Sequence, residues 1–119
     1  MIGRLEKTVL DCEDPTALAA FYAAVLGMRV TEDDGDWVVI GRAPGARELA
    51  FQRAEGWVPP RWPDPGHPQQ AHLDIRVDDV EEAERSVLAL GARRLPAERE
   101  EGFRVFADPA GHPFCLVFG

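Results

Sequence analysis

The chain has 119 residues, of which 45% are hydrophobic, and this suits one compact globule with an ordinary core. The formal net charge of -8 and the absence of clustered Lys and Arg argue against nucleic-acid binding, because phosphate contacts need such clusters. No apolar run approaches the roughly 18 residues of a membrane span, so we expect a soluble, cytoplasmic protein without a membrane partner. Cys12 and Cys115 are too few for a disulfide framework and match no zinc motif, so reduced thiols are expected.

The first part of the chain predicts a strand, a helix and then three strands. The first strand is expected over residues 4–12, with Lys7 on the face away from the helix. Asp14 followed by Pro15 is typical of a helix N-terminus, and Gly27 after an amphipathic stripe predicts where that helix ends. Three strands are expected next, over residues 28–32, 37–41 and 48–53.

The clearest pattern is the strict alternation over residues 71–77, which predicts a strand with one apolar and one polar face. The polar face carries His72, Asp74 and Arg76. Asp79 can cap the helix expected over residues 80–90, with Glu82 in the capping-box position. Further strands are expected over residues 93–95, 103–107 and 113–118, with turns at 100–102 and 108–111.

The two halves follow the same pattern at a shift of 65 positions, which places Lys7 over His72 and Asp14 over Asp79. A long period seen once indicates a duplicated module rather than a solenoid. We therefore expect a single domain over residues 1–119. It would contain a first module at about 4–53, a connector at 54–70 and a second module at about 71–118.

The connector interleaves five prolines with Trp57 and Trp62, which predicts a stiff segment without regular structure. Tryptophans in a loop are costly to leave in water, so we expect the connector to pack back on the body or on a second subunit. The alternative is a ligand lid, because long loops with aromatic residues are often functional. His67 in this connector and His112 in a turn are expected at the surface.

Several short motifs accompany the tandem βαβββ pattern. They are Asp14-Pro15, Phe21-Tyr22, Leu26-Gly27, His72-Leu73-Asp74 and the run from Asp108 to Leu116. In this respect the chain resembles the vicinal oxygen chelate superfamily, which includes glyoxalase I, extradiol dioxygenases and bleomycin- and fosfomycin-resistance proteins. The resemblance covers nearly the whole chain and implies an α+β fold. In that fold the tandem modules form a curved, cup-shaped mixed sheet with helices on its convex side, and the members commonly form homodimers.

Metal-dependent members of the superfamily place one ligand on the first and one on the last strand of each module. The corresponding positions here are Lys7, Ala50, His72 and Cys115, and protonated lysine and alanine cannot act as donors. With only two good donors, we expect no resident metal and purification without stoichiometric zinc, nickel or iron. A divalent metal stays an alternative, held by His72 and Cys115 with Gln52 as an additional ligand.

Chemistry without a metal would use the polar strand face, which the resemblance places inside the cup. His72, Asp74, Arg76 and Lys7 would either bind an anionic or oxygen-rich ligand or satisfy one another as an ion network. His72 beside Cys115 could also form an imidazolium–thiolate pair, against the commoner case of an apolar core cysteine.

Two classes of function therefore stay open. One is a glyoxalase-like lyase or isomerase with His72 as general base, or a metal-dependent lyase, isomerase or dioxygenase of the glyoxalase I type. The other is a protein that binds a small oxygenated or aromatic molecule, as antibiotic-sequestering resistance proteins do. Trp37, Trp57 and Trp62 would then offer stacking surfaces. The incomplete ligand set favours binding or metal-free chemistry, and we expect a protein that binds its ligand without a metal or with an atypical metal site.

Overall fold

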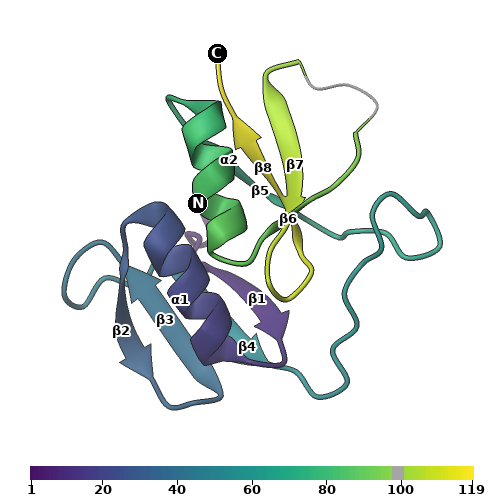
Figure 1. Cartoon of the computed structure of the whole chain (residues 1–119). Helices are drawn as coiled ribbons and strands as arrows, with labels where there is room; N and C mark the ends of the chain where they lie inside the picture. Colours follow the sequence, from purple (N-terminus) through teal and green to yellow (C-terminus); the bar gives the residue numbers. More distant parts are fainter. Residues whose placement is uncertain (98–100) are drawn as a thin grey trace. The chain divides into compact units, whose positions relative to one another are not determined.

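The computed structural model describes residues 1–97 and 101–119, so Glu100 of the predicted turn at 100–102 lies outside the described residues. The chain divides into two compact units, residues 1–57 and 58–119 (Figure 1). The division falls inside the predicted connector, so residues 58–70 fold with the second unit. No helix in the described ranges has both the length and the apolar character to cross a bilayer.

The first unit is a four-stranded mixed sheet with one helix packed against its strands. Its elements are β1 (Thr8–Cys12), α1 (Pro15–Leu26), β2 (Arg29–Asp33), β3 (Trp37–Gly41) and β4 (Leu49–Arg53). The strand order is β1-β4-β3-β2, with β1 parallel to β4 and the other pairs antiparallel. The core is centred on Tyr22 and Phe51, whose fully buried rings stack with centroids 5.7 Å apart.

The second unit repeats this arrangement. Its elements are β5 (Leu73–Arg76), α2 (Val80–Ala89), β6 (Arg93–Arg94), β7 (Phe103–Ala107) and β8 (Pro113–Val117). The order is β5-β8-β7-β6, and α2 packs against β8 and β6. Phe106 and Phe114 are fully buried and stack with centroids 5.6 Å apart. The tandem βαβββ architecture and the α+β class predicted from the sequence are therefore confirmed.

The duplication also holds at the level of strand register. In the first unit Thr8 lies opposite Leu49, and in the second unit Leu73 lies opposite Phe114, so both partners are displaced by 65 positions. Each module brings its first and last strands together as a parallel pair. This pairing fixes which side chains of the two strands lie next to one another.

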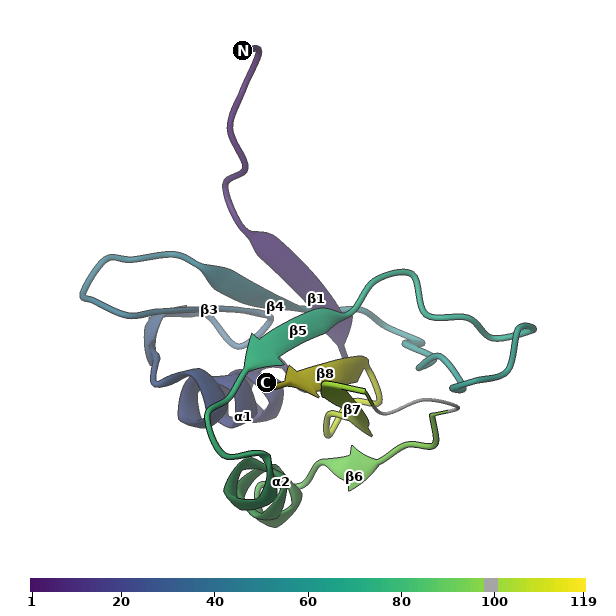
Figure 2. The same ribbon diagram turned by 90° about the horizontal axis from the view of Figure 1, so that it is seen from above.

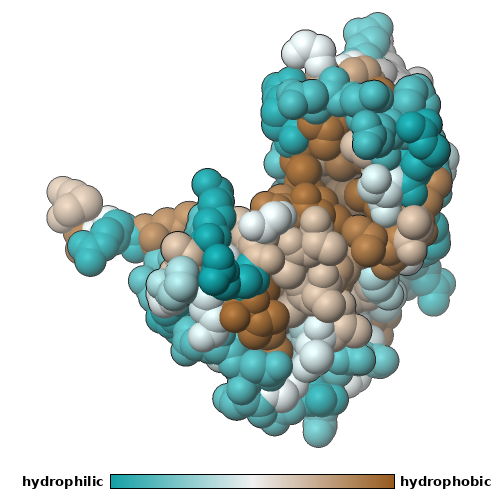
Figure 3. Space-filling model, turned by 60° about the vertical axis from the view of Figure 1, so that its left-hand side comes forward, coloured by the Kyte–Doolittle hydropathy of each residue, from teal (hydrophilic) through white to brown (hydrophobic). Residues whose placement is uncertain are grey.

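The predicted first strand was too long at its start. Residues 1–7 precede β1, and Figures 2 and 3 show them projecting away from the sheet of their own unit as an extended segment. The side chains of Met1, Ile2 and Leu5 in this segment are exposed. Exposed apolar side chains are compatible with self-association, and the homodimer that the family resemblance leads us to expect for this chain stays a prediction.

The turn between β7 and β8 is organised around a buried carboxylate. Asp108 is 2% exposed, and its Oδ1 atom accepts hydrogen bonds from the backbone N–H groups of Ala110, Gly111 and His112. The Nδ1 atom of His112 lies 2.9 Å from Asp108 Oδ2, and the histidine side chain is only 13% exposed. The prediction that His112 lies at the surface was wrong, because its ring completes the set of groups around this carboxylate.

Both helices begin at the predicted N-caps. Asp14 Oδ1 accepts from the N–H of Ala17 at 3.1 Å, and Asp79 Oδ1 accepts from the N–H of Glu82 at 3.1 Å. Gly27 follows α1 with a φ of 66°, the left-handed conformation that glycine adopts without steric cost. The capping residues and the terminating glycine therefore set the helix limits that the sequence predicted.

Replacing Asp79 by alanine is expected to lower the free energy of unfolding by about 1 kcal/mol, because an N–H group of the first turn loses its acceptor. Urea denaturation followed by circular dichroism measures the change. Asp78→Ala removes the adjacent exposed carboxylate without touching the cap, so its effect should be smaller. Equal losses for the two variants would show that net charge, rather than capping, determines the stability here.

Candidate functional site

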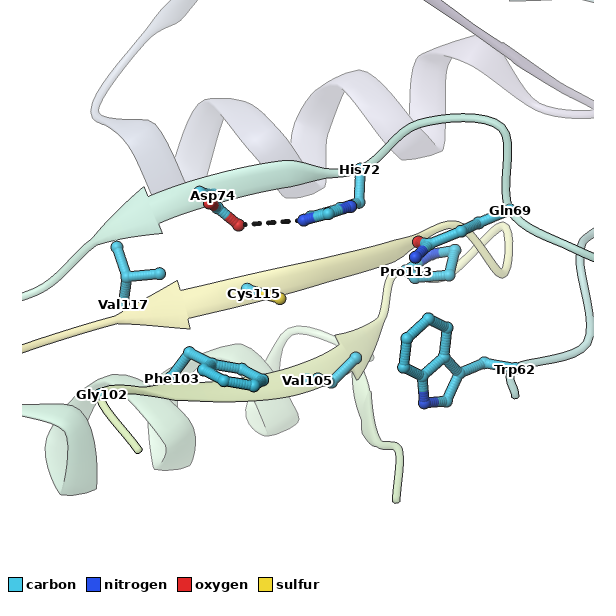
Figure 4. Close-up of a pocket in the computed structure, with 10 residues that line it drawn as sticks. All are labelled: Trp62, Gln69, His72, Asp74, Gly102, Phe103, Val105, Pro113, Cys115 and Val117. Carbon is cyan, nitrogen blue, oxygen red and sulfur yellow. Dashed lines mark ion pairs between the residues drawn. The ribbon is translucent and has the colours of Figure 1, made fainter. Parts of the chain in front are cut away.

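A cavity of about 330 Å³ lies on one face of the sheet in the second unit (Figure 4). Alternate residues of the strands point into it, while the intervening residues Phe114 and Leu116 of β8 are fully buried. The lining comes from β5, β7, β8 and the loops next to them. It comprises Trp62, Gln69, His72, Asp74, Gly102, Phe103, Val105, Pro113, Cys115 and Val117.

Three polar side chains meet at one side of the cavity. His72 precedes β5, and its Nε2 atom lies 3.2 Å from Oδ1 of Asp74, as the dashed line in Figure 4 marks. Cys115 of β8 lies directly opposite Asp74 in the parallel pair. The donor atoms of the three residues all lie within 4.8 Å of one another. The imidazole and carboxylate are 41% and 59% exposed, whereas Cys115 is only 9% exposed.

The surroundings of Cys115 favour its protonated form. Burial raises the pKa of the thiol to about 11, and the negative charge of Asp74 and a hydrogen bond to that carboxylate add to the effect. A cysteine that acts as a nucleophile near neutral pH needs the opposite change in pKa. The structure therefore favours a neutral thiol over the imidazolium–thiolate pair considered from the sequence.

The connector contributes Trp62 and Gln69 to the lining of the cavity. The indole Nε1 of Trp62 donates to the carbonyl oxygen of Pro96 at 2.6 Å, which fixes the ring at the cavity. Trp62 packs against a cluster that includes Leu95 and Val105, so the prediction that the connector packs back on the body is confirmed for this residue. Gln69, also in the connector, has its Oε1 atom buried with no hydrogen-bond partner among the described residues.

The charges around this cavity differ from those expected for the predicted cup. Arg76 is not among the lining residues, and its Nη1 atom donates to the carbonyl oxygen of Gly119 at 3.2 Å. Within the described part of the chain, the lining holds no lysine or arginine, and its charge comes from Asp74 with His72. The excess of positive charge predicted for the ligand site does not occur in this cavity.

The other predicted ligand-binding residues belong to the first unit. The Nζ atom of Lys7 lies 5.8 Å from the ring centroid of Trp37 and 3.2 Å from Oε2 of Glu6. Gln52 on β4 and Trp57 at the end of the unit complete this set. Their participation in a common site with His72 and its neighbours stays a prediction.

Sequence reasoning missed most of the apolar lining. Phe103, Val105, Pro113 and Val117 were placed on strands but not in a site. A signal was present, because Pro113 and Val117 alternate with Cys115 and so share its face of β8. The residues of β7 opposite that face follow from the antiparallel register, in which Val105 lies opposite Cys115.

The donor atoms of this chain differ from those that metal-dependent proteins of the predicted fold use. Lys7 and Ala50 occupy two of the implied positions and cannot act as ligands. Asp74 supplies a donor that those positions did not include, so the second unit offers nitrogen, oxygen and sulfur together. Such a mixed set fits zinc, whereas magnesium prefers oxygen ligands alone.

Comparisons with known proteins agree with the fold. Residues 7–117 match the family model described as a glyoxalase-like domain. A glyoxalase/bleomycin resistance protein/dioxygenase family enzyme from Burkholderia phytofirmans is 18% identical with a TM-score of 0.74, and the match covers 98% of each chain. A glyoxalase-related enzyme from Fulvimarina pelagi is 19% identical with a TM-score of 0.68, covering 99% of this chain and 89% of that chain.

The trypanothione-dependent glyoxalase I of Leishmania major is 20% identical with a TM-score of 0.67, and the match covers 98% of this chain and 86% of that chain. None of the curated proteins matches the sequence. At these identities the similar structures establish the fold and leave the reaction to be argued from the site.

Proposed function

Because the chain belongs to the glyoxalase-like domain family, which it matches over residues 7–117, we propose that its second unit binds a small oxygenated or aromatic molecule. The observation that carries this proposal is the cavity itself. It joins an apolar wall, which includes Trp62 and Phe103, to the polar cluster formed by His72, Asp74 and Cys115 (Figure 4). Pockets of this kind bind a ligand by its apolar body and orient it by a few polar contacts.

The polar groups indicate the chemistry of the ligand. The buried Oε1 atom of Gln69 and the carboxylate of Asp74 both accept hydrogen bonds, so the ligand should carry an O–H or N–H donor. The indole N–H of Trp62 is already hydrogen-bonded to the carbonyl oxygen of Pro96, so the indole can contact a ligand only through its ring. A flat ring of the ligand would stack on it. A phenol, hydroxylated heterocycle or similar small molecule meets both requirements.

The size of the cavity helps to distinguish between a small metabolite and an antibiotic as its ligand. A volume of about 330 Å³ is at the lower end of ligand pockets, and this supports a small metabolite over a bulky antibiotic. Catalysis of the lyase or isomerase kind is supported by the pair of His72 and Asp74: the carboxylate lies 3.2 Å from Nε2 and would accept its N–H, which leaves Nδ1 as the nitrogen that can take up a proton. Binding is common to all these functions and is tested first.

The test is a thermal-shift screen of the full chain against small hydroxylated aromatic compounds, followed by calorimetric titration of the best hit. Trp62→Ala should weaken binding by about tenfold or more, since it removes an aromatic contact worth on the order of 1.4 kcal/mol. Trp62→Phe keeps an aromatic face and should retain most of the affinity.

Trp57→Ala is the matched control, because it removes a tryptophan of the first unit that is not among the residues lining the cavity. Affinity should not change in that variant. A hit that binds equally well to Trp62→Ala, or that is lost with Trp57→Ala, would place the binding site outside the cavity and contradict the proposal.

A further inference from the structure

The strongest unassigned feature of the molecule is the set of donor atoms at the cavity. We propose that His72, Asp74 and Cys115 form a three-donor zinc site contained entirely within the second unit. The proposal rests on geometry: the donor atoms belong to His72, which directly precedes β5, to Asp74 of β5 and to Cys115 of β8, and all lie within 4.8 Å of one another. It does not depend on the proposed organic ligand.

The sequence explains why these donors converge. His72 and Asp74 are two positions apart at β5, so the strand alternation directs both side chains to the same face. The parallel register then sets Cys115 directly opposite Asp74. Figure 4 shows the imidazole and the carboxylate directed at one another above β8, beside the cysteine side chain.

The chemistry of the donors selects the metal. Zinc binds imidazole nitrogen, thiolate sulfur and carboxylate oxygen, and it commonly uses three protein ligands where the fourth position stays open. Cys115 makes magnesium and calcium poor candidates, because both prefer oxygen donors. All three residues also line the cavity, so a fourth position would be accessible to a small molecule bound there.

The proposed site differs from that of the metal-dependent members of the superfamily, in which each of the two modules supplies two of the four ligands. The internal repeat shows this difference. At the shift of 65 positions, His72, Asp74 and Cys115 correspond to Lys7, Val9 and Ala50. The corresponding residues of the first unit therefore provide no donor set of this kind. Asp74 takes the place of ligands from the other module, which makes the proposed site specific to the second half of this chain.

The experiment is a zinc titration of the full chain, freed of metal by a chelator, in competition with a chromophoric zinc indicator. One zinc per chain is expected. Cobalt substitution gives a second readout, since a thiolate ligand adds a charge-transfer band in the near ultraviolet. Losing even an outer-shell partner typically costs about 10–100-fold in metal affinity, so Asp74→Asn should weaken zinc binding by at least about tenfold.

Cys115→Ser should abolish the cobalt charge-transfer band, and circular dichroism would verify that each variant is folded. His67→Ala is the matched control, because His67 also pairs with an aspartate, Asp64, at 3.1 Å but has no cysteine beside it. That variant should bind zinc as the unmodified chain does. Gln52→Ala should do the same, because Gln52 lies in the first unit.

Three results would overturn the proposal. They are fewer than one zinc per chain at saturation, unchanged affinity in Asp74→Asn, and weakened binding in Gln52→Ala. The last result would show that the first unit supplies a ligand. Failure of the zinc titration would leave the binding of an aromatic molecule to the Trp62 wall unaffected, so the two proposals are tested separately.

Discussion

Replacing Asp108 by alanine is expected to lower the free energy of unfolding by about 3 kcal/mol or more. The carboxylate is buried and accepts three backbone N–H groups, from Ala110, Gly111 and His112, in addition to its contact with His112 Nδ1. Removing it takes a shared acceptor from these donors at a largely buried position, although the N–H of Gly111 keeps the carbonyl oxygen of Asp108. Each buried group that loses its hydrogen bond costs about 1–3 kcal/mol. The loss can be measured by urea denaturation of the full chain.

Asp64 provides a control with similar local geometry. It accepts from the backbone N–H of Gly66 at 2.8 Å and lies 3.1 Å from Nδ1 of His67, but the turn is exposed. Water can replace these contacts, so Asp64→Ala should change the stability little. A large loss in Asp108→Ala with a small loss in Asp64→Ala would attribute the effect to burial. Similar losses in both would contradict the argument.

Asp108→Ala should also affect the cavity. The turn that Asp108 holds leads directly into β8, which begins at Pro113 and carries Cys115. If the turn loosens, the register that sets Cys115 opposite Asp74 loses one of its supports. Weaker binding of zinc and of aromatic ligands should therefore accompany the loss of stability.

The helices and strands were predictable because their signals are local. The N-caps at Asp14 and Asp79 and the alternation from His72 to Arg76 depend on residues within a few positions of one another. The parallel pairing of β1 with β4 and of β5 with β8 joins segments about forty positions apart. Local signals could not indicate it, and the family resemblance implied only that the first and last strands of a module are neighbours.

The donor set was only partly predictable. His72 and Cys115 were identified from the positions at which the resembled family carries ligands. Asp74 was instead assigned to ligand binding or to an ion network. Its place as the residue opposite Cys115 follows from the strand register, which a list of ligand positions does not contain. The prediction that the protein binds no metal counted two donors, and the structure brings a third beside them.

The connector and the β7–β8 turn could not be described in advance, because neither has a repeating pattern. Trp62 donates to the carbonyl oxygen of Pro96, a partner 34 positions away. The turn residues of the Asp108 segment resembled an ordinary surface turn. Several backbone N–H groups converge on that carboxylate, and together they compensate for its burial.

The thiol of Cys115 is expected to react with iodoacetamide much more slowly than an ordinary cysteine while no metal is bound. Its pKa of about 11 lies above the usual value of 9.0, and the thiolate is the reacting form. Near pH 8 this difference reduces the thiolate fraction by about a hundredfold, since each pKa unit corresponds to a factor of ten. The rate should rise with pH and level off only above about pH 11.

Asp74→Asn separates the two causes of this slow reaction. Burial is the larger cause and remains in the variant, whereas the carboxylate charge, which opposes formation of the thiolate, is removed. The midpoint of the rate profile should therefore move to lower pH without reaching 9.0, and the rate near pH 8 should rise several-fold. Peptide mass spectrometry in the presence of a chelator measures Cys115 apart from Cys12. A midpoint near 9.0 in the unmodified chain, or a higher midpoint in the variant, would show that the carboxylate does not act on this thiol as the structure indicates.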